Sequence, residues 1–115
     1  VLQPHRFTRV RDLFESFCTC FNNADIVVVA DIYAAGELPI EGINQSSLVE
    51  GLKSHGHRNV IALKSSENLS ELVHEYLRAG DIVVCLGAGS ITIWANSLPD
   101  SLAKLRGVNI EGKEC

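Results

Sequence analysis

The chain has 115 residues, of which 46% are apolar, and carries a formal net charge of −4. This length suits one globular domain with a sizeable core. The acidic balance excludes a general attraction to nucleic acid or to an anionic membrane, so any cationic chemistry must be local. The apolar runs are too short to span a bilayer and the first residues do not resemble a signal peptide, which predicts a cytoplasmic protein.

The first residues, Val1-Leu2, resemble the end of a strand, and we expect that the domain lacks its beginning. A helix follows from about Thr8 to Asn22, because apolar side chains recur there at the spacing of one helix face. This apolar stripe, which we expect in the core, consists of Val10, Leu13, Phe14, Phe17, Cys18 and Phe21.

The next predicted element is a strand from Asp25 to Asp31. Its β-branched residues run on without alternating with polar ones, which is typical of a strand covered on both faces of a parallel sheet. A stretch without a clear period, from Tyr33 to Gln45, precedes a second helix around Leu48. Ser47 and Glu50 are expected to form the capping box of that helix.

The second half of the chain repeats the alternation of strand and helix. A strand is predicted from Asn59 to Lys64, a helix from Leu69 to Leu77, and another continuous apolar strand from Asp81 to Leu86. Gly87-Ala88-Gly89 turns the chain toward a last helical region, in which Pro99 either breaks one helix or opens a second. Strands that alternate with helices predict an open α/β sheet with right-handed crossovers.

Neither the cysteines nor the histidines suggest a metal site. Cys18, Cys20, Cys85 and Cys115 lack the spacing of zinc ligands or of a disulfide framework. We expect Cys18 and Cys85 to be buried, reduced thiols. The histidines at positions 55, 57 and 74 also lack metal-like spacing, and we expect them on the surface.

In open α/β sheets, ligands bind beyond the carboxyl ends of the strands. The first loop there holds His5, Arg6 and Arg9 around the start of the first helix. Free backbone N–H groups and the helix dipole also favour an anion at this place. The alternative is a solvated basic turn, in which Arg9 pairs with Asp12 along the helix surface. Composition alone leaves both interpretations open.

Arg11 differs from the other two arginines in its expected partner. It lies four residues before Glu15, and we expect it to form a surface ion pair along the helix rather than to bind a ligand.

The second loop runs from Asp31 to Gly42 and is longer than the usual connection between a strand and a helix. Long loops at strand ends are often binding loops, but a surface excursion with glycine turns is the alternative.

Gly87-Ala88-Gly89 is half of a dinucleotide-binding fingerprint, but Ser90-Ile91-Thr92 follows and the third glycine is missing. A strand-to-helix turn explains this segment better than a cofactor site. The chain also lacks a phosphate-binding P-loop, so we expect that it does not activate ATP by itself.

Three segments together resemble one known family. The segment from Gln3 to Arg9, Gln-Pro-His-Arg-Phe-Thr-Arg, closely resembles a signature of the L-alanine-adding ligases of the Mur ligase family. The segment Asp31-Ile32-Tyr33-Ala34-Ala35-Gly36-Glu37, with Pro39, Ile40 and Gly42, and the turn Leu86-Gly87-Ala88-Gly89 resemble two further segments of the same ligases, in the same order. The chain departs from the family at Ser90-Ile91-Thr92.

The resemblance implies a C-terminal domain of such a ligase over residues 1–107, followed by a tail over residues 108–115. The fold would be Rossmann-like, an open and mostly parallel sheet flanked by helices in three layers, without its first strand and helix. An N-terminal domain for the UDP-sugar and a central P-loop domain would belong to the same full-length chain. ATP and Mg²⁺ would bind mainly to the central domain, so no cofactor, metal or catalytic residue is expected in this chain.

Members of the family phosphorylate the carboxylate of UDP-N-acetylmuramate with ATP, after which the amine of L-alanine displaces the phosphate. By resemblance, we assign Arg6 and Arg9 to anionic groups of substrate or product, including the alanine carboxylate, and His5 to hydrogen bonding beside them. Tyr33, Ala35 and Glu37 would shape the same pocket, and Asp31 would position their loop. Alone, the chain is expected to be inactive.

The competing hypothesis is a free-standing Rossmann-like module that binds a nucleotide or another anion without catalysis.

Overall fold

Helices and short strands alternate in the computed structural model, which describes residues 1–105. The tail predicted for residues 108–115 lies outside the described residues. The alternation of helices and strands confirms the α/β class. The elements are α1 (Phe7–Asp12), α2 (Phe14–Thr19), β1 (Val27–Val29), α3 (Gln45–Ser54), β2 (Val60–Ala62), the 3₁₀ helix η1 (Ser66–Asn68), α4 (Leu69–Tyr76) and α5 (Ile91–Leu105).

The sheet is parallel. β1 and β2 pair along their whole length, and all three valines of β1 are buried, as the β-branched run predicts. Residues 1–3 extend the sheet on the other side of β1, because Leu2 forms parallel bridges with both Val29 and Leu86. The order across the sheet is therefore the segment ending at Leu86, residues 1–3, β1 and β2, and their carboxyl ends meet at one edge.

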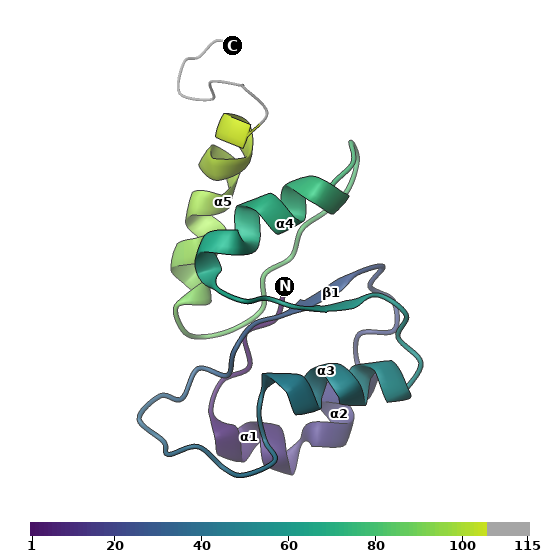
Figure 1. The fold of residues 1–115 in the computed structure, drawn as a ribbon, viewed down its shortest axis with the longest axis vertical. Helices are drawn as coiled ribbons and strands as arrows, with labels where there is room; N and C mark the ends of the chain where they lie inside the picture. Colours follow the sequence, from purple (N-terminus) through teal and green to yellow (C-terminus); the bar gives the residue numbers. More distant parts are fainter. Residues whose placement is uncertain (106–115) are drawn as a thin grey trace.

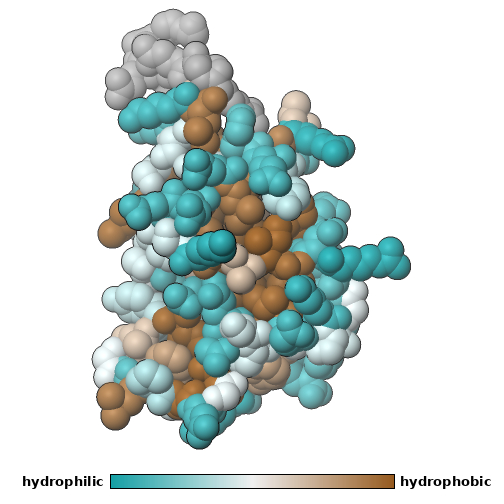
Figure 2. All heavy atoms as spheres, in the orientation of Figure 1, coloured by the Kyte–Doolittle hydropathy of each residue, from teal (hydrophilic) through white to brown (hydrophobic). Residues whose placement is uncertain are grey.

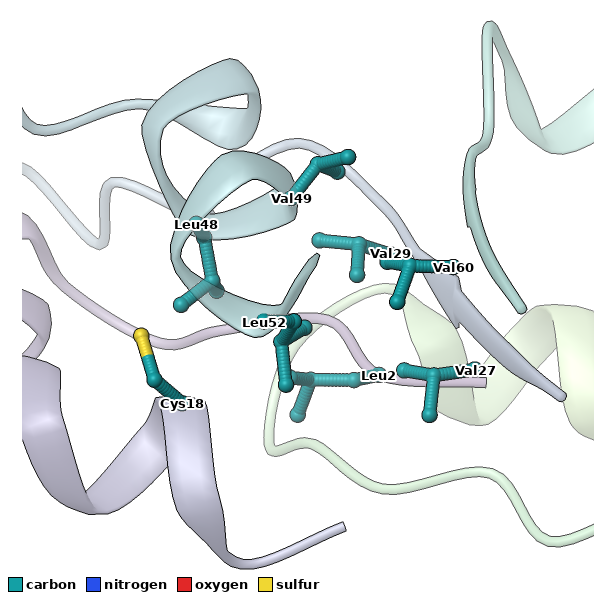
Figure 3. Packing of buried hydrophobic residues seen from close by; sticks show 8 residues of the cluster. All are labelled: Leu2, Cys18, Val27, Val29, Leu48, Val49, Leu52 and Val60. Atoms are coloured by element: carbon teal, nitrogen blue, oxygen red, sulfur yellow. The ribbon is translucent and has the colours of Figure 1, made fainter. Parts of the chain in front are cut away.

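Each face of the sheet is covered by helices (Figure 1). Successive side chains of a strand point to opposite faces, so Val27 and Val29 pack into one core cluster and Val28 into another. The first cluster joins the sheet to α2 and α3, and its members are Leu2, Cys18, Val27, Val29, Leu48, Val49, Leu52 and Val60 (Figure 3). The second joins it to α4 and α5 through Val28, Ala30, Leu63, Leu69, Val73 and Leu98.

The helix expected from Thr8 to Asn22 is divided in two at Leu13, whose backbone has φ −115° and ψ 23°. Leu13 was predicted to belong to the core stripe, and this was wrong: it is 50% exposed. Phe14 and Cys18 instead turn toward α3, where Gly51 leaves room for both side chains because a β-carbon there would overlap the Cys18 sulfur and contact the Phe14 ring. The bend lets α2 pack on α3. Cys18 is buried, as expected, whereas Cys85, also expected to be buried, is only half-buried.

The cap of α3 differs from the expected one. Asn44 rather than Ser47 is the N-cap: its side-chain oxygen accepts a hydrogen bond from the Ser47 N–H at 2.8 Å. The Ser47 hydroxyl oxygen accepts in return from the Asn44 N–H at 3.0 Å, so Ser47 takes the position that the sequence analysis gave to Glu50. The side chains of asparagine and serine supply the same two acceptors as the common serine and glutamate pair.

The segment from Asp81 to Leu86, predicted as an apolar strand, is largely exposed. Its backbone does pair with residues 1–3, since the Leu86 N–H donates to the Val1 carbonyl oxygen at 2.8 Å. Within residues 1–105 this segment has no neighbouring strand on its other side, and Ile82 and Val84 are 86% and 54% exposed. Figure 2 shows apolar atoms at the surface in the middle of the face that it draws.

Pro99 neither ends α5 nor opens a second helix, because α5 runs without interruption from Ile91 to Leu105. Proline cannot donate a backbone hydrogen bond, which destabilises a helix. The burial of Leu98 and Ala103, before and after Pro99, offsets this cost. No helix within residues 1–105 has both the length and the apolar character that crossing a bilayer requires.

Candidate functional site

The two loops singled out in the sequence lie side by side at the carboxyl edge of the sheet. The Tyr33 N–H donates to the Pro4 carbonyl oxygen and the Arg6 N–H donates to the Tyr33 carbonyl oxygen, both at 2.8 Å. These two bonds form a parallel bridge between His5 and Tyr33. The backbone thus brings His5 and Arg6 next to the loop that begins at Asp31.

The rings of His5 and Tyr33 are stacked, with centroids 5.7 Å apart and planes inclined by 14°. His5 is half-buried and Tyr33 is 40% exposed, so an edge of this pair faces solvent. The Tyr33 ring also lies directly against Gly89, because a β-carbon built on Gly89 would lie only 2.5 to 2.8 Å from three of its ring carbons. The third segment of the sequence resemblance therefore joins the other two.

Glu37 lies at the start of α1. One of its carboxylate oxygens accepts the Thr8 hydroxyl at 2.6 Å and the other accepts the Thr8 backbone N–H at 3.1 Å. The Thr8 hydroxyl and then the Thr8 N–H are the main causes that lower the pKa of Glu37 below its ordinary value, and the charge of Arg6 adds a smaller contribution. A carboxylate of the chain itself thus caps the first turn of α1, where the sequence analysis expected N–H groups free for a ligand.

Arg6 and Arg9 are both exposed, and neither forms an ion pair within residues 1–105. Within residues 1–105 neither the expected Arg11–Glu15 pair nor the Arg9–Asp12 pair of the alternative interpretation is formed. Arg11 instead contacts Asp12, with Nε 2.9 Å from the carboxylate oxygen. The side chains of Arg6 and Arg9, one turn apart at the start of α1, are thus positive charges without an ion-pair partner among residues 1–105.

Two residues of the site adopt backbone conformations that favour glycine. Arg6 has φ 71° and ψ 134°, and Ala35 has φ 53°. A residue with a β-carbon is strained there by about 1 to 3 kcal/mol, and such strain persists where surrounding contacts impose it. At Arg6 the hydrogen bond from its N–H to Tyr33 is one such contact.

Asp31 and Ala35, the remaining predicted members of the site, lie in the same loop. Asp31 is exposed just beyond the end of β1. Ala35 occupies a turn in which the Glu37 N–H donates to the Ala34 carbonyl oxygen at 3.0 Å. The turn directs Glu37 back toward Thr8.

Gln3 is a buried polar residue of the site to which the sequence alone assigned no separate role. Its side-chain oxygen accepts the Ile91 N–H at 3.0 Å, and its side-chain nitrogen donates to the Ser90 hydroxyl at 2.9 Å. Gln3 is 4% exposed and connects the turn before His5 to the start of α5. The only local sign of this role in the sequence is that Gln3 directly follows the apolar residues Val1-Leu2.

Gln45 has a similar bridging role, which the sequence analysis missed. Its side-chain nitrogen donates to the carbonyl oxygens of Val29 and Leu63, both at 2.7 Å. Gln45 thereby connects the carboxyl ends of β1 and β2, and the loop that begins at Asp31 follows β1. No local pattern announces such a contact, because its partners lie 16 and 18 residues away.

Two surface hollows lie away from these residues. One, of about 410 Å³, is at the amino ends of β1 and β2 and is lined by Asn22, Ala24, Asp25, His55, Gly56, His57, Arg58 and Asn59. The other, of about 240 Å³, lies between α4 and α5. Residues 1–105 contain no group of three or more histidine, cysteine, aspartate or glutamate side chains suited to a metal ion.

His57 was expected on the surface, and this was wrong, since it is only 9% exposed. Its Nε2 lies 2.8 Å from the Ala24 carbonyl oxygen, and its Nδ1 accepts the Asn59 N–H at 3.2 Å. Both ring nitrogens are used to close the amino end of the sheet.

Similarity to known proteins covers nearly the whole chain. It is 64% identical over 107 residues to the UDP-N-acetylmuramate–L-alanine ligase of Parvibaculum lavamentivorans, 62% over 109 residues to that of Rhodospirillum centenum, and 60% over 105 residues to that of Methylobacterium sp. strain 4-46. These alignments cover 91 to 95% of the chain but only 22 to 23% of the length of each relative. No family model matches the chain.

Proposed function

The chain belongs to the UDP-N-acetylmuramate–L-alanine ligase family, and from this we propose that it is the C-terminal, substrate-closing domain of such a ligase. The full-length enzyme would join L-alanine to UDP-N-acetylmuramate at the expense of ATP, in the cytoplasm, as a step of peptidoglycan biosynthesis. The identity of about 60% to proteins that carry this name supports the proposal.

The observation that carries the proposal is the convergence of three segments at one edge of the sheet. Residues 3–9, 31–37 and 87–90 are joined there by the bridge between His5 and Tyr33, by the packing of Gly89 on Tyr33, and by Gln3 at the start of α5. In open α/β sheets this edge is where ligands bind.

The roles follow from the charges at that edge. The reaction brings together a phosphorylated carboxyl group and the carboxylate of L-alanine, so negative charge accumulates. Exposed guanidinium groups that arrive with a closing domain stabilise this charge while the site excludes water. We assign Arg6 and Arg9 to these anions and the imidazole of His5 to a hydrogen bond beside them.

The loop residues would act indirectly. Tyr33 contacts His5, Glu37 caps α1, and Ala35 forms the turn between them. Asp31 stands at the entrance of this loop. We therefore propose that these four residues shape the pocket and leave the ligand charges to Arg6 and Arg9.

ATP supplies the phosphoryl group when it is bound. Arg6, Arg9 and the imidazole of His5 suit phosphate or carboxylate oxygens, whereas the Glu37 carboxylate is already engaged by Thr8. We therefore assign ATP and Mg²⁺ mainly to the remainder of the full-length ligase, together with the UDP-sugar.

The proposed fold is Rossmann-like with three layers. Supporting this, four parallel segments follow the order of the segment ending at Leu86, residues 1–3, β1 and β2, with helices on both faces. Such sheets bind ligands where the order of the strands reverses, which here lies between residues 1–3 and the segment ending at Leu86.

A chimeric ligase tests the proposal: a full-length relative in which this chain replaces the matching segment. ADP formation should require both UDP-N-acetylmuramate and L-alanine. Arg6→Ala and Arg9→Ala should each lower kcat/KM for L-alanine on the order of 100-fold, because each removes a charge that stabilises the transition state. Arg11→Ala is the matched control and should change little, since Arg11 contacts Asp12. Near-normal kcat/KM in both variants would exclude the assigned roles.

A further inference from the structure

The Tyr33 ring contacts two residues from other segments of the chain: His5 from the first loop and Gly89 from the turn before α5. Its backbone is held beside His5 by two hydrogen bonds of 2.8 Å, from Tyr33 to Pro4 and from Arg6 to Tyr33. Its ring stacks on the His5 imidazole with only 14° between the planes. The orientation of the imidazole is thus coupled to the position of the tyrosine ring.

Gly89 determines how far that ring can approach the sheet. A β-carbon at position 89 would lie 2.5 Å from the first ring carbon and 2.7 to 2.8 Å from its two neighbours, distances that real β-carbons essentially never show. The ring therefore rests on the backbone of Gly89. Any side chain at position 89 would displace the ring, because the opposing atoms belong to a rigid aromatic group.

The position of Gly89 is itself fixed by a buried side chain. The Gln3 amide holds the Ser90 hydroxyl at 2.9 Å and the Ile91 N–H at 3.0 Å, directly after Gly89. Gln3 is 4% exposed, so these hydrogen bonds are shielded from water. The start of α5 is in this way attached to the residues that precede His5.

From these contacts we propose that Gly89 and Tyr33 are positioning residues for His5: the backbone of Gly89 supports the Tyr33 ring, and this ring orients the imidazole toward the substrate. From the sequence, the turn Gly87-Ala88-Gly89 is expected only to connect a strand to a helix. The part of the proposal that concerns substrate rests on the proposed function. The mechanical link from position 89 to His5 does not depend on it.

A double-mutant cycle in the chimeric ligase tests the link. Gly89→Ala should lower kcat/KM for L-alanine on the order of 10- to 100-fold, as expected when a substrate-positioning group moves by about 1 Å. In a Tyr33→Ala background, where no ring opposes the new methyl group, Gly89→Ala should have little further effect. Equal effects of Gly89→Ala in both backgrounds would overturn the proposal.

Two variants separate positioning from a general loss of stability. Tyr33→Phe keeps the ring and should retain near-normal kcat/KM, whereas Tyr33→Ala should reduce it. Gly51→Ala is the control for crowding alone, because a β-carbon there would overlap the Cys18 sulfur in the packing of α2 on α3. Its effect should be the same with and without the Tyr33 ring. A loss in Tyr33→Phe equal to that in Tyr33→Ala would contradict the role of the ring.

A spectroscopic measurement checks the link without any activity. In the chimeric ligase with isotope-labelled histidine, the ring protons of His5 should change chemical shift in Gly89→Ala and in Tyr33→Ala, but not in Tyr33→Phe, because the stacked ring produces the shift. Unchanged His5 signals in Gly89→Ala would overturn the link. If the signals respond while Arg6→Ala and Arg9→Ala keep normal activity, the link holds and the proposed function fails.

Discussion

The two ends of the parallel sheet satisfy their polar groups in different ways. At the amino end, His57 is buried and both of its ring nitrogens have backbone partners, while the Asn59 side chain donates to the Asp25 carbonyl oxygen at 3.1 Å. At the carboxyl end, Arg6 and Arg9 are exposed without an ion-pair partner among residues 1–105.

Backbone strain follows the same division. The two non-glycine residues with positive φ in the described chain, Arg6 and Ala35, both lie at the carboxyl end. Strain and unpaired charge reduce stability, and they are retained where function requires them. The comparison teaches that substitution of His57 at the amino end should cost stability, whereas substitution of Arg6 or Arg9 at the carboxyl end should cost activity.

The largest effect on stability is expected at the amino end. His57→Ala leaves the Ala24 carbonyl oxygen and the Asn59 N–H without their partners and should lower the free energy of unfolding by about 2 to 3 kcal/mol. Urea denaturation of the chain, followed by the fluorescence of its single tryptophan, Trp94, measures this change. His55→Ala is the control, because His55 is exposed, and should cost less than about 1 kcal/mol. Equal costs would remove the distinction between these histidines.

Glu37 should make stability depend on pH at the carboxyl end. Its pKa is lowered in the folded chain by the hydrogen bonds from Thr8, so the folded state favours the ionised carboxylate. The stabilisation is complete above the ordinary pKa of a glutamate and is lost as the pH falls through the lowered value. Urea denaturation at several pH values should therefore show a difference between the chain and Glu37→Gln that shrinks toward acid. A difference independent of pH would contradict the carboxylate cap.

The smallest effect, and one of opposite sign, is expected for Arg6→Gly. Glycine adopts positive φ without strain, but it loses more freedom on folding than arginine does. The net change in the free energy of unfolding should lie between zero and an increase of about 1 kcal/mol. Arg6→Ala keeps the strain and should be the less stable of the two. A clear loss of stability in Arg6→Gly would show that the guanidinium supports the fold.

Much of the site was predictable because parallel strands place their carboxyl ends together. Gln3–Arg9 and Asp31–Gly42 each follow a predicted strand, so both are expected at the same edge of the sheet. The bridge between His5 and Tyr33 agrees with this expectation. The role of Glu37 as a cap of α1 was not predictable, because Thr8 lies 29 residues away. The bridging amides of Gln3 and Gln45 were missed for the same reason.

The sequence by itself determined the type and order of the elements, since hydrophobic period and β-branched runs act over a few neighbouring residues. Which side chains of each element are buried was decided by the tertiary structure. Leu13 left the core because the chain bends there and α2 packs on α3. Ile82 and Val84 stayed exposed because their side chains join neither core cluster of residues 1–105. The positive φ of Arg6 likewise depends on a contact with Tyr33, across 27 residues of chain, which no local preference of arginine favours.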